Sequence, residues 1–90
     1  MSSNRVASIR ARLETELAPV SLEITDDSHR HAGHAGARDG RGHFNVTIVA
    51  SRFAGANRVA RHRMVYAALG GLMQTDIHAL SVTALAPDEV

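Results

Sequence analysis

The amino-acid sequence predicts one α+β domain over residues 1–90, with the order αββαβ and a three-stranded mixed sheet that carries its helices on one face. Three observations lead to this prediction. The 90 residues suffice for one modest core. Two segments repeat apolar residues at helical spacing, and three others alternate apolar and polar residues as half-buried strands do. Packing the helices on one face of the sheet buries all of this apolar surface together.

The first predicted element is a helix over about residues 4–17. Pro19 lacks a backbone N–H and its ring clashes with the preceding turn, so we expect the helix to end before it. Charged residues occupy the other faces of this helix. The apolar residues that recur every three or four positions are Val6, Ile9, Leu13 and Leu17.

Two predicted strands follow, joined by a long connection. Val20, Leu22 and Ile24 alternate with polar residues and predict the first strand. The second strand covers residues 43–50, and its inward parity consists of Phe44, Val46, Ile48 and Ala50. The connection, residues 28–42, is rich in histidine and glycine, and we expect a flexible hairpin loop there. Loops of this length inside a compact domain are uncommon and are usually functional.

A second helix is predicted over residues 57–73, after a turn at Phe53 and Gly55. Gly70 and Gly71 weaken the end of this helix, because glycine is a poor helix former. Its apolar stripe consists of Val65, Leu69, Leu72 and Met73, with Val59 and Tyr66 beside it.

A third strand completes the predicted domain. His78, Leu80 and Val82 share one parity with Ala84, so unbroken alternation makes His78 a half-buried residue at a strand edge. A helix between the second and third strands predicts that they are parallel and joined by a right-handed crossover. We expect residues 87–90 to fray.

The composition excludes several classes of function. The chain has no cysteine, which excludes disulfides, thiol nucleophiles and an iron–sulfur cluster held by this chain alone. The net charge of +1 provides no global basic field of the kind that marks a dedicated nucleic-acid-binding protein. No apolar run approaches the roughly 20 residues of a membrane span, and the N-terminus does not resemble a secretory signal. We therefore expect a cytoplasmic protein. No catalytic arrangement is visible in the sequence, so we expect that the protein is not an enzyme.

Histidine is the abundant metal-ligating residue of this chain. The six histidines are His29, His31, His34, His43, His62 and His78. Taken alone, the three in the predicted loop are consistent with a solvated loop as well as with a metal site. His43 is expected to be a strand-end residue.

Four motifs, in this order and spacing, resemble the BolA family. They are HFNV at 43–46, the Phe53–Ala54–Gly55 turn, Arg61–His62–Arg63 with Val65 and Leu69 behind it, and Ile77–His78–Ala79–Leu80. The resemblance extends from about Val6 to Pro87 and implies a fold similar to the type II KH domain. The sequence departs from RNA-binding KH domains, because it has no GxxG loop between two helices.

The resemblance also implies a partner and a cofactor. BolA-like proteins form heterocomplexes with monothiol glutaredoxins that bridge a [2Fe–2S] cluster, and the glutaredoxin cysteine and glutathione supply its thiolates. The BolA-like chain supplies a histidine at the start of its last strand, which corresponds to His78, and a second ligand from the hairpin loop. Counting back from the HFNV motif favours His34 as that second ligand, with His31 as the alternative and His29 as a weaker third. Imidazole binds a metal only when neutral, so such a site is expected to weaken on mild acidification.

A second interpretation involves nucleic acid. Arg58, Arg61 and Arg63 lie early in the second predicted helix, in a segment that faintly resembles a helix-turn-helix. Some BolA-like proteins are regarded as transcription regulators, so DNA is an alternative partner. A solvated helix face, with His62 as a structural histidine, is the favoured interpretation of the same residues. No motif argues for or against a homodimer.

Overall fold

The structure, a computed structural model, describes residues 2–27 and 42–90, with only the backbone described for residues 2–4. Its helices and strands follow the predicted αββαβ order, with one further short helix. The elements are α1 (Ser2–Leu17), β1 (Ser21–Asp26), β2 (Gly42–Val49), α2 (Arg58–Leu69), α3 (Leu72–Thr75) and β3 (Ile77–Leu85), with two single-turn 3₁₀ helices, η3 (Ser51–Phe53) and η4 (Pro87–Glu89). The predicted loop lies outside the described residues, apart from Gly42, which begins β2.

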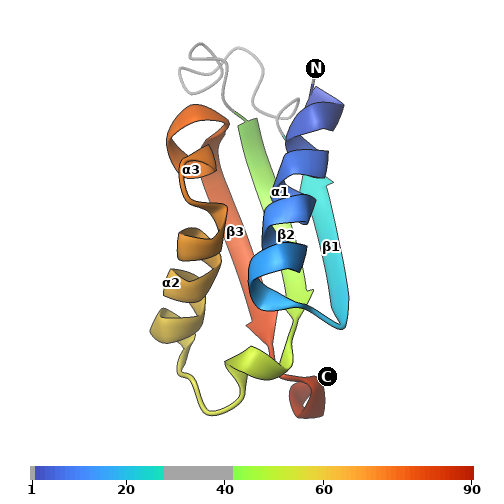
Figure 1. The fold of residues 1–90 in the computed structure, drawn as a ribbon, viewed down its shortest axis with the longest axis vertical. Coiled ribbons are helices and arrows are strands. Elements are labelled where there is room, and N and C mark those ends of the chain that lie inside the picture. The colour runs from blue at the N-terminus through green and yellow to red at the C-terminus, as the bar shows by residue number, and fades with distance from the viewer. Residues whose placement is uncertain (1, 28–41) are drawn as a thin grey trace.

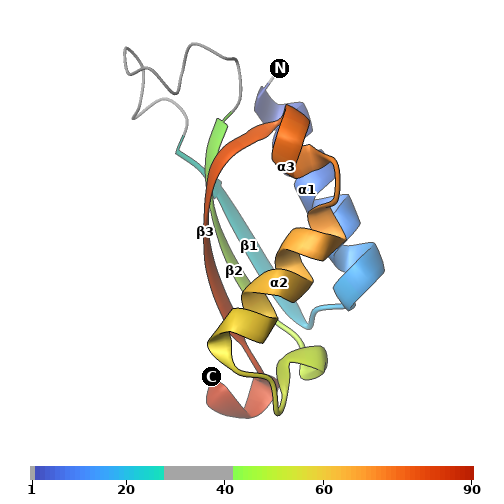
Figure 2. The same cartoon turned by 90° about the vertical axis from the view of Figure 1, so that its left-hand side faces the viewer.

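One mixed sheet of three strands forms the back layer of the molecule. The strand order is β1–β2–β3, in which β2 is antiparallel to β1 and parallel to β3. The helices α1, α2 and α3 all lie on one face of this sheet, and no described helix covers the other face (Figures 1 and 2). With α2 in front of the sheet in Figure 1, β3 lies to the left of β2 and both strands run downward, so the crossover is right-handed as expected.

The hydrophobic core lies between the helices and the sheet, and it includes the predicted apolar faces of α1, β2 and α2. Each element contributes its apolar face, because only this arrangement removes both the helical stripes and the inward strand faces from water. The largest fully buried side chains are Phe53, Ile9, Leu13, Ile48, Leu69, Ile77, Val46 and Val65.

The predicted long helix is interrupted after its third turn, which corrects the prediction of one helix to Met73. It begins one residue later than predicted, because Asn57 is its N-cap and the Asn57 side chain accepts a bond from the Ala60 N–H. Gly70 takes a positive φ of +55°, which ends α2 and starts the separate helix α3. Arg12 on α1 donates from Nε to the carbonyl of Ala68 at 3.1 Å, so this end of α2 is also tied to α1.

The structure exposes three large apolar residues of the predicted helices and strands, Val20, Val59 and Tyr66. Val20 is 70% exposed because it lies in the bend that follows Pro19, before β1 begins, and not in the strand. Val59 and Tyr66 are exposed on α2, whereas Val65 and Leu69 on the same helix are buried.

The C-terminal residues Pro87–Glu89 form η4, and fraying of residues 87–90 stays a prediction. Glu89 makes a pair of interactions in this segment. Its carboxylate accepts the Ala86 N–H at 2.9 Å and receives two bonds from the Arg61 guanidinium, which fixes the segment against α2. No helix in the described ranges is long and apolar enough to cross a membrane.

Candidate functional site

A bulge in β3 determines where His78 lies. The parallel register pairs Gly42 with Ile77 and then His43 with Ala79, so β3 contains one residue more than β2 at this point. In such a bulge two residues of one strand face a single residue of the other, and the side chains that follow are re-aimed. His78 and Ala79 together therefore face His43.

The bulge corrects the predicted position of His78. Unbroken alternation gives His78 the inward parity of Leu80, but the structure places Ile77 in the core, where it is only 1% exposed. Ile77 and Leu80 both contact the core although they are three positions apart, which the extra residue makes possible. His78 is consequently exposed and not half-buried.

His43 and His78 lie side by side as a result. Their ring centroids are 5.1 Å apart and the rings are tilted by 46°, within the range that aromatic pairs favour. The His43 side chain is half-buried, and its Nε2 atom is shielded from solvent. We call these two residues the histidine pair.

The surroundings of the histidine pair are fixed by short backbone and side-chain bonds. The Asp27 N–H donates to the His43 carbonyl at 2.8 Å, and the Asp27 carboxylate accepts a bond from the Asn45 side-chain amide. The Gly42 N–H donates to the Asp76 carbonyl at 2.9 Å, which joins the starts of β2 and β3. These bonds join the end of β1 and the starts of β2 and β3 at the edge of the sheet that carries the histidine pair.

A small pocket lies beside the pair. Its volume is about 180 Å³. The residues that line it come from the position just after β1 and from neighbouring positions of the paired strands β2 and β3. The lining residues are Asp27, His43, Phe44, Asn45, Ala79 and Ser81. The outward parity of β2 supplies His43 and Asn45 to it, so the pocket opens on the sheet face that the helices leave uncovered.

The predicted loop ligands His29, His31 and His34 lie outside the described residues. Within the described ranges, no three histidine, aspartate or glutamate side chains are grouped closely enough to hold a metal ion. The described part of the chain therefore offers an exposed imidazole, His78, and a second imidazole beside it, but no complete coordination shell.

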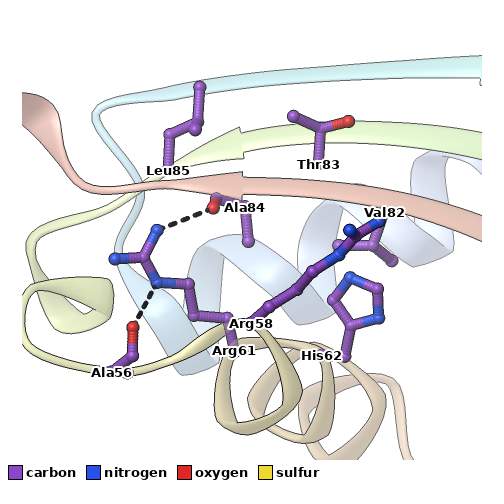
Figure 3. Close-up of a pocket in the computed structure, with 8 residues that line it drawn as sticks. All are labelled: Ala56, Arg58, Arg61, His62, Val82, Thr83, Ala84 and Leu85. Atoms are coloured by element: carbon purple, nitrogen blue, oxygen red, sulfur yellow. Dashed lines mark hydrogen bonds between the residues drawn. The ribbon is translucent and has the colours of Figure 1, made fainter. Parts of the chain in front are cut away.

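Two arginines of the alternative interpretation, Arg58 and Arg61, lie at a different place, beside a groove between α2 and the edge strand β3 (Figure 3). Its volume is about 390 Å³. Arg58, Arg61 and His62 line its helical side, and residues 82–85 of β3 line the other. Arg63 does not line this groove, because it is about 140° around the helix from Arg58.

Arg61 makes interactions that hold the domain together. Its Nε donates to the Ala56 carbonyl at 2.8 Å and its Nη1 to the Ala84 carbonyl at 3.0 Å, which joins α2 to β3 (Figure 3). The guanidinium also binds both carboxylate oxygens of Glu89, at 2.6 and 2.7 Å. Its side chain is only 12% exposed. Of the three predicted arginines, this one is thus engaged within the protein.

The same interaction changes the acidity of Glu89. The hydrogen bonds from Arg61, followed by the bond from the Ala86 N–H, lower the pKa of Glu89 to about 2. Sequence reasoning missed Glu89. It placed His43 at the start of its strand on the outward parity, near the expected metal site, but it did not predict the ring contact with His78. The only sequence signal for Glu89 was its position as a carboxylate three residues beyond Ala86. The bulge in β3 had no signal, because the apolar periodicity of the sequence does not predict a bulge.

Comparison with known proteins identifies relatives over most of this chain. A family described as BolA-like protein matches residues 13–89. The Arabidopsis thaliana protein named BOLA1, chloroplastic, is 47% identical over 89 residues, which are 96% of this chain and 56% of the relative. The chain thus spans about half the length of that protein.

Two further comparisons bear on fold and on function. The solved BolA domain of SufE1 from Arabidopsis thaliana superimposes with a TM-score of 0.84 at 44% identity, over 96% of this chain and 95% of that chain. An Escherichia coli K12 protein named DNA-binding transcriptional regulator BolA is 41% identical over 78 residues, which are 82% of this chain and 71% of that protein. The fold is therefore matched by solved relatives throughout the described core.

Proposed function

The chain belongs to the BolA family, and from this premise we propose that it is an adaptor that binds a monothiol glutaredoxin and contributes histidine ligands to a shared [2Fe–2S] cluster. It would act in iron–sulfur cluster handling or iron sensing. The observation that carries this proposal is the bulge in β3, which leaves His78 exposed at the edge of the sheet face that no described helix covers. An exposed imidazole on a rigid strand is available to a ligand that a second protein presents.

The residues present fit a shared site and not a site held by this chain alone. Iron–sulfur clusters are held mainly by cysteine thiolates, and this chain has no cysteine. Histidine can replace cysteine at one iron. The described ranges supply the exposed imidazole of His78 with His43 beside it, but no group of three possible ligands. A partner that brings thiolates would complete the shell.

Within this proposal His78 is the first ligand, and the second is His34, with His31 as the alternative. Both loop residues follow Asp27 and precede Gly42 in the chain, and these two positions flank the histidine pair. When bound, the cluster would supply electron-transfer or iron-sensing chemistry. The residues of this chain would hold it through neutral imidazoles and would fix its orientation relative to the sheet.

Anaerobic reconstitution tests this proposal. The protein, a monothiol glutaredoxin, glutathione, iron and sulfide should form a heterocomplex that carries one cluster and elutes as one species. His34→Ala should reduce the cluster content more than His31→Ala, and His62→Ala on α2 serves as the histidine control. Equal cluster content for wild type and every loop variant would contradict the assignment of a loop ligand.

We also infer a second candidate function, DNA binding, because one relative bears the name of a DNA-binding transcriptional regulator. Arg58 and Arg63 are the exposed arginines of α2 that would contact phosphate, whereas Arg61 is engaged with Glu89. Fluorescence anisotropy with a labelled duplex tests this function. Binding should fall steeply with salt and weaken in Arg58→Ala. Salt-independent binding, or none, would contradict it.

The cytoplasmic location remains our proposal for this chain. The Arabidopsis relative is named as chloroplastic. Neither interpretation assigns a catalytic residue to this protein.

A further inference from the structure

We infer that His43 is a positioning residue for His78: its ring holds the exposed imidazole of His78 in one orientation on the open sheet face. This inference rests on the proposed role of His78 as a ligand. The observation behind it is the contact of the two rings, with centroids 5.1 Å apart and planes tilted by 46°.

The two histidines differ in how firmly they are held. His43 lies between buried Gly42 and buried Phe44 in the central strand, its Nε2 is shielded from solvent, and its carbonyl accepts the Asp27 N–H. His78 lies on an edge strand at a bulge and is exposed. The half-buried ring therefore acts as a fixed surface against which the exposed ring rests, and not the reverse.

The bulge makes this contact possible. Without the extra residue, His78 would take the inward parity of Leu80 and point away from His43. With it, His78 and Ala79 both face His43, and the small side chain of Ala79 leaves room beside the ring. The bulge thus exposes the proposed ligand His78 and also places its ring against His43, which limits the rotation of the His78 side chain.

A ligand that is already oriented loses less conformational entropy when it binds. Fixing one flexible side chain at an interface weakens binding by about two- to tenfold when the side chain is not held beforehand. His43 would therefore strengthen cluster sharing without touching the cluster. The shielded Nε2 of His43 argues for this indirect role and against direct ligation by that atom.

Two variants of His43 distinguish contact through the ring from action through its nitrogens. His43→Phe keeps an aromatic ring of similar size but has no nitrogen, and His43→Ala removes the ring. We predict that His43→Ala needs about two- to tenfold more protein to convert a glutaredoxin-bound cluster to the shared form, followed by circular dichroism. His43→Phe should restore the wild-type midpoint. If His43→Phe is as weak as His43→Ala, or if His43→Ala is unchanged, the inference is overturned.

A measurement on the protein without iron keeps the inference separate from the proposed function. NMR side-chain couplings of His78 should report one dominant χ1 rotamer in wild type and in His43→Phe, and averaged rotamers in His43→Ala. Averaged rotamers in wild type would overturn the inference even if the cluster forms. If His78→Ala leaves cluster sharing unchanged, the proposed ligand role fails, and the rotamer measurement still decides whether His43 positions His78.

Discussion

At the scale of single residues, Arg61 and Glu89 show how a functional and a structural interpretation of one side chain are separated. The sequence places Arg61 in a basic triplet, which is typical of both a nucleic-acid contact and a solvated helix face. The structure gives it two backbone carbonyls and the two oxygens of Glu89. Its contribution is therefore to join α2, β3 and η4.

The lowered pKa of Glu89 makes the stability of this protein depend on pH. Its pKa falls from 4.5 to about 2 in the folded state, so the carboxylate stabilises the fold above pH 4.5 and this contribution is lost as the pH falls through about 2. We predict that Glu89→Gln lowers the Tm at pH 6 and that the difference from wild type shrinks towards zero at pH 2. Thermal melts across this range test it, with exposed Glu16→Gln on α1 as control. A difference independent of pH would contradict the prediction.

At the scale of elements, the sequence predicts α1, β1 and β2 well because their apolar residues follow one unbroken period. It fails where a single residue changes the period. Gly70 divides the predicted long helix, and the bulge at His78 shifts the inward parity by one residue. Neither feature could be predicted from the local sequence. Gly70 and Gly71 are equally consistent with a weakened helix end, and the alternation of apolar and polar residues around His78 continues past Leu80.

The break between α2 and α3 depends on Gly70 and not on its neighbour. Gly70 has a φ of +55°, and an added Cβ would lie 3.2 Å from the Arg12 guanidinium. Gly71 is in the right-handed helical region, with nothing within 4 Å of an added Cβ. We predict that Gly70→Ala destabilises the fold by about 1–3 kcal/mol, whereas Gly71→Ala is neutral or stabilises by up to about 1 kcal/mol. Urea unfolding of both variants tests this, and equal midpoints would contradict it.

At the scale of the whole molecule, one core joins all the helices and strands. Leu13 of α1, Phe53 of η3 and Ile77 of β3 belong to the same buried cluster. This single core explains why the fold class and the core positions of α1, β2 and α2 were predictable from the pattern of apolar residues. Ile77 was not predictable in this way, because the bulge places it in the core against the alternation. The functional site was only partly predictable, since the pairing of His43 with His78 depends on a register between strands that are far apart in the chain.

A core shared by every element should unfold in one cooperative transition. We predict that Leu13→Ala costs about 2–5 kcal/mol, which lowers the Tm by about 4–8 °C for each kcal/mol in a domain of this size. Val59→Ala, at an exposed position of α2, should change the Tm little. Scanning calorimetry of the two variants makes the comparison, and similar Tm values would contradict a single shared core.

We propose that His78, which the bulge in β3 leaves exposed, is a ligand of a cluster shared with a second protein. The most direct test is the absorption and circular-dichroism spectrum of a mixture of this protein with a monothiol glutaredoxin, glutathione, iron and sulfide, for wild type and His78→Ala. We expect the wild-type mixture to give a spectrum distinct from that of the glutaredoxin cluster alone. His78→Ala should abolish or alter this new spectrum. A wild-type spectrum identical to that of the glutaredoxin alone would contradict the shared cluster, and a new spectrum unchanged by His78→Ala would contradict the assignment of His78.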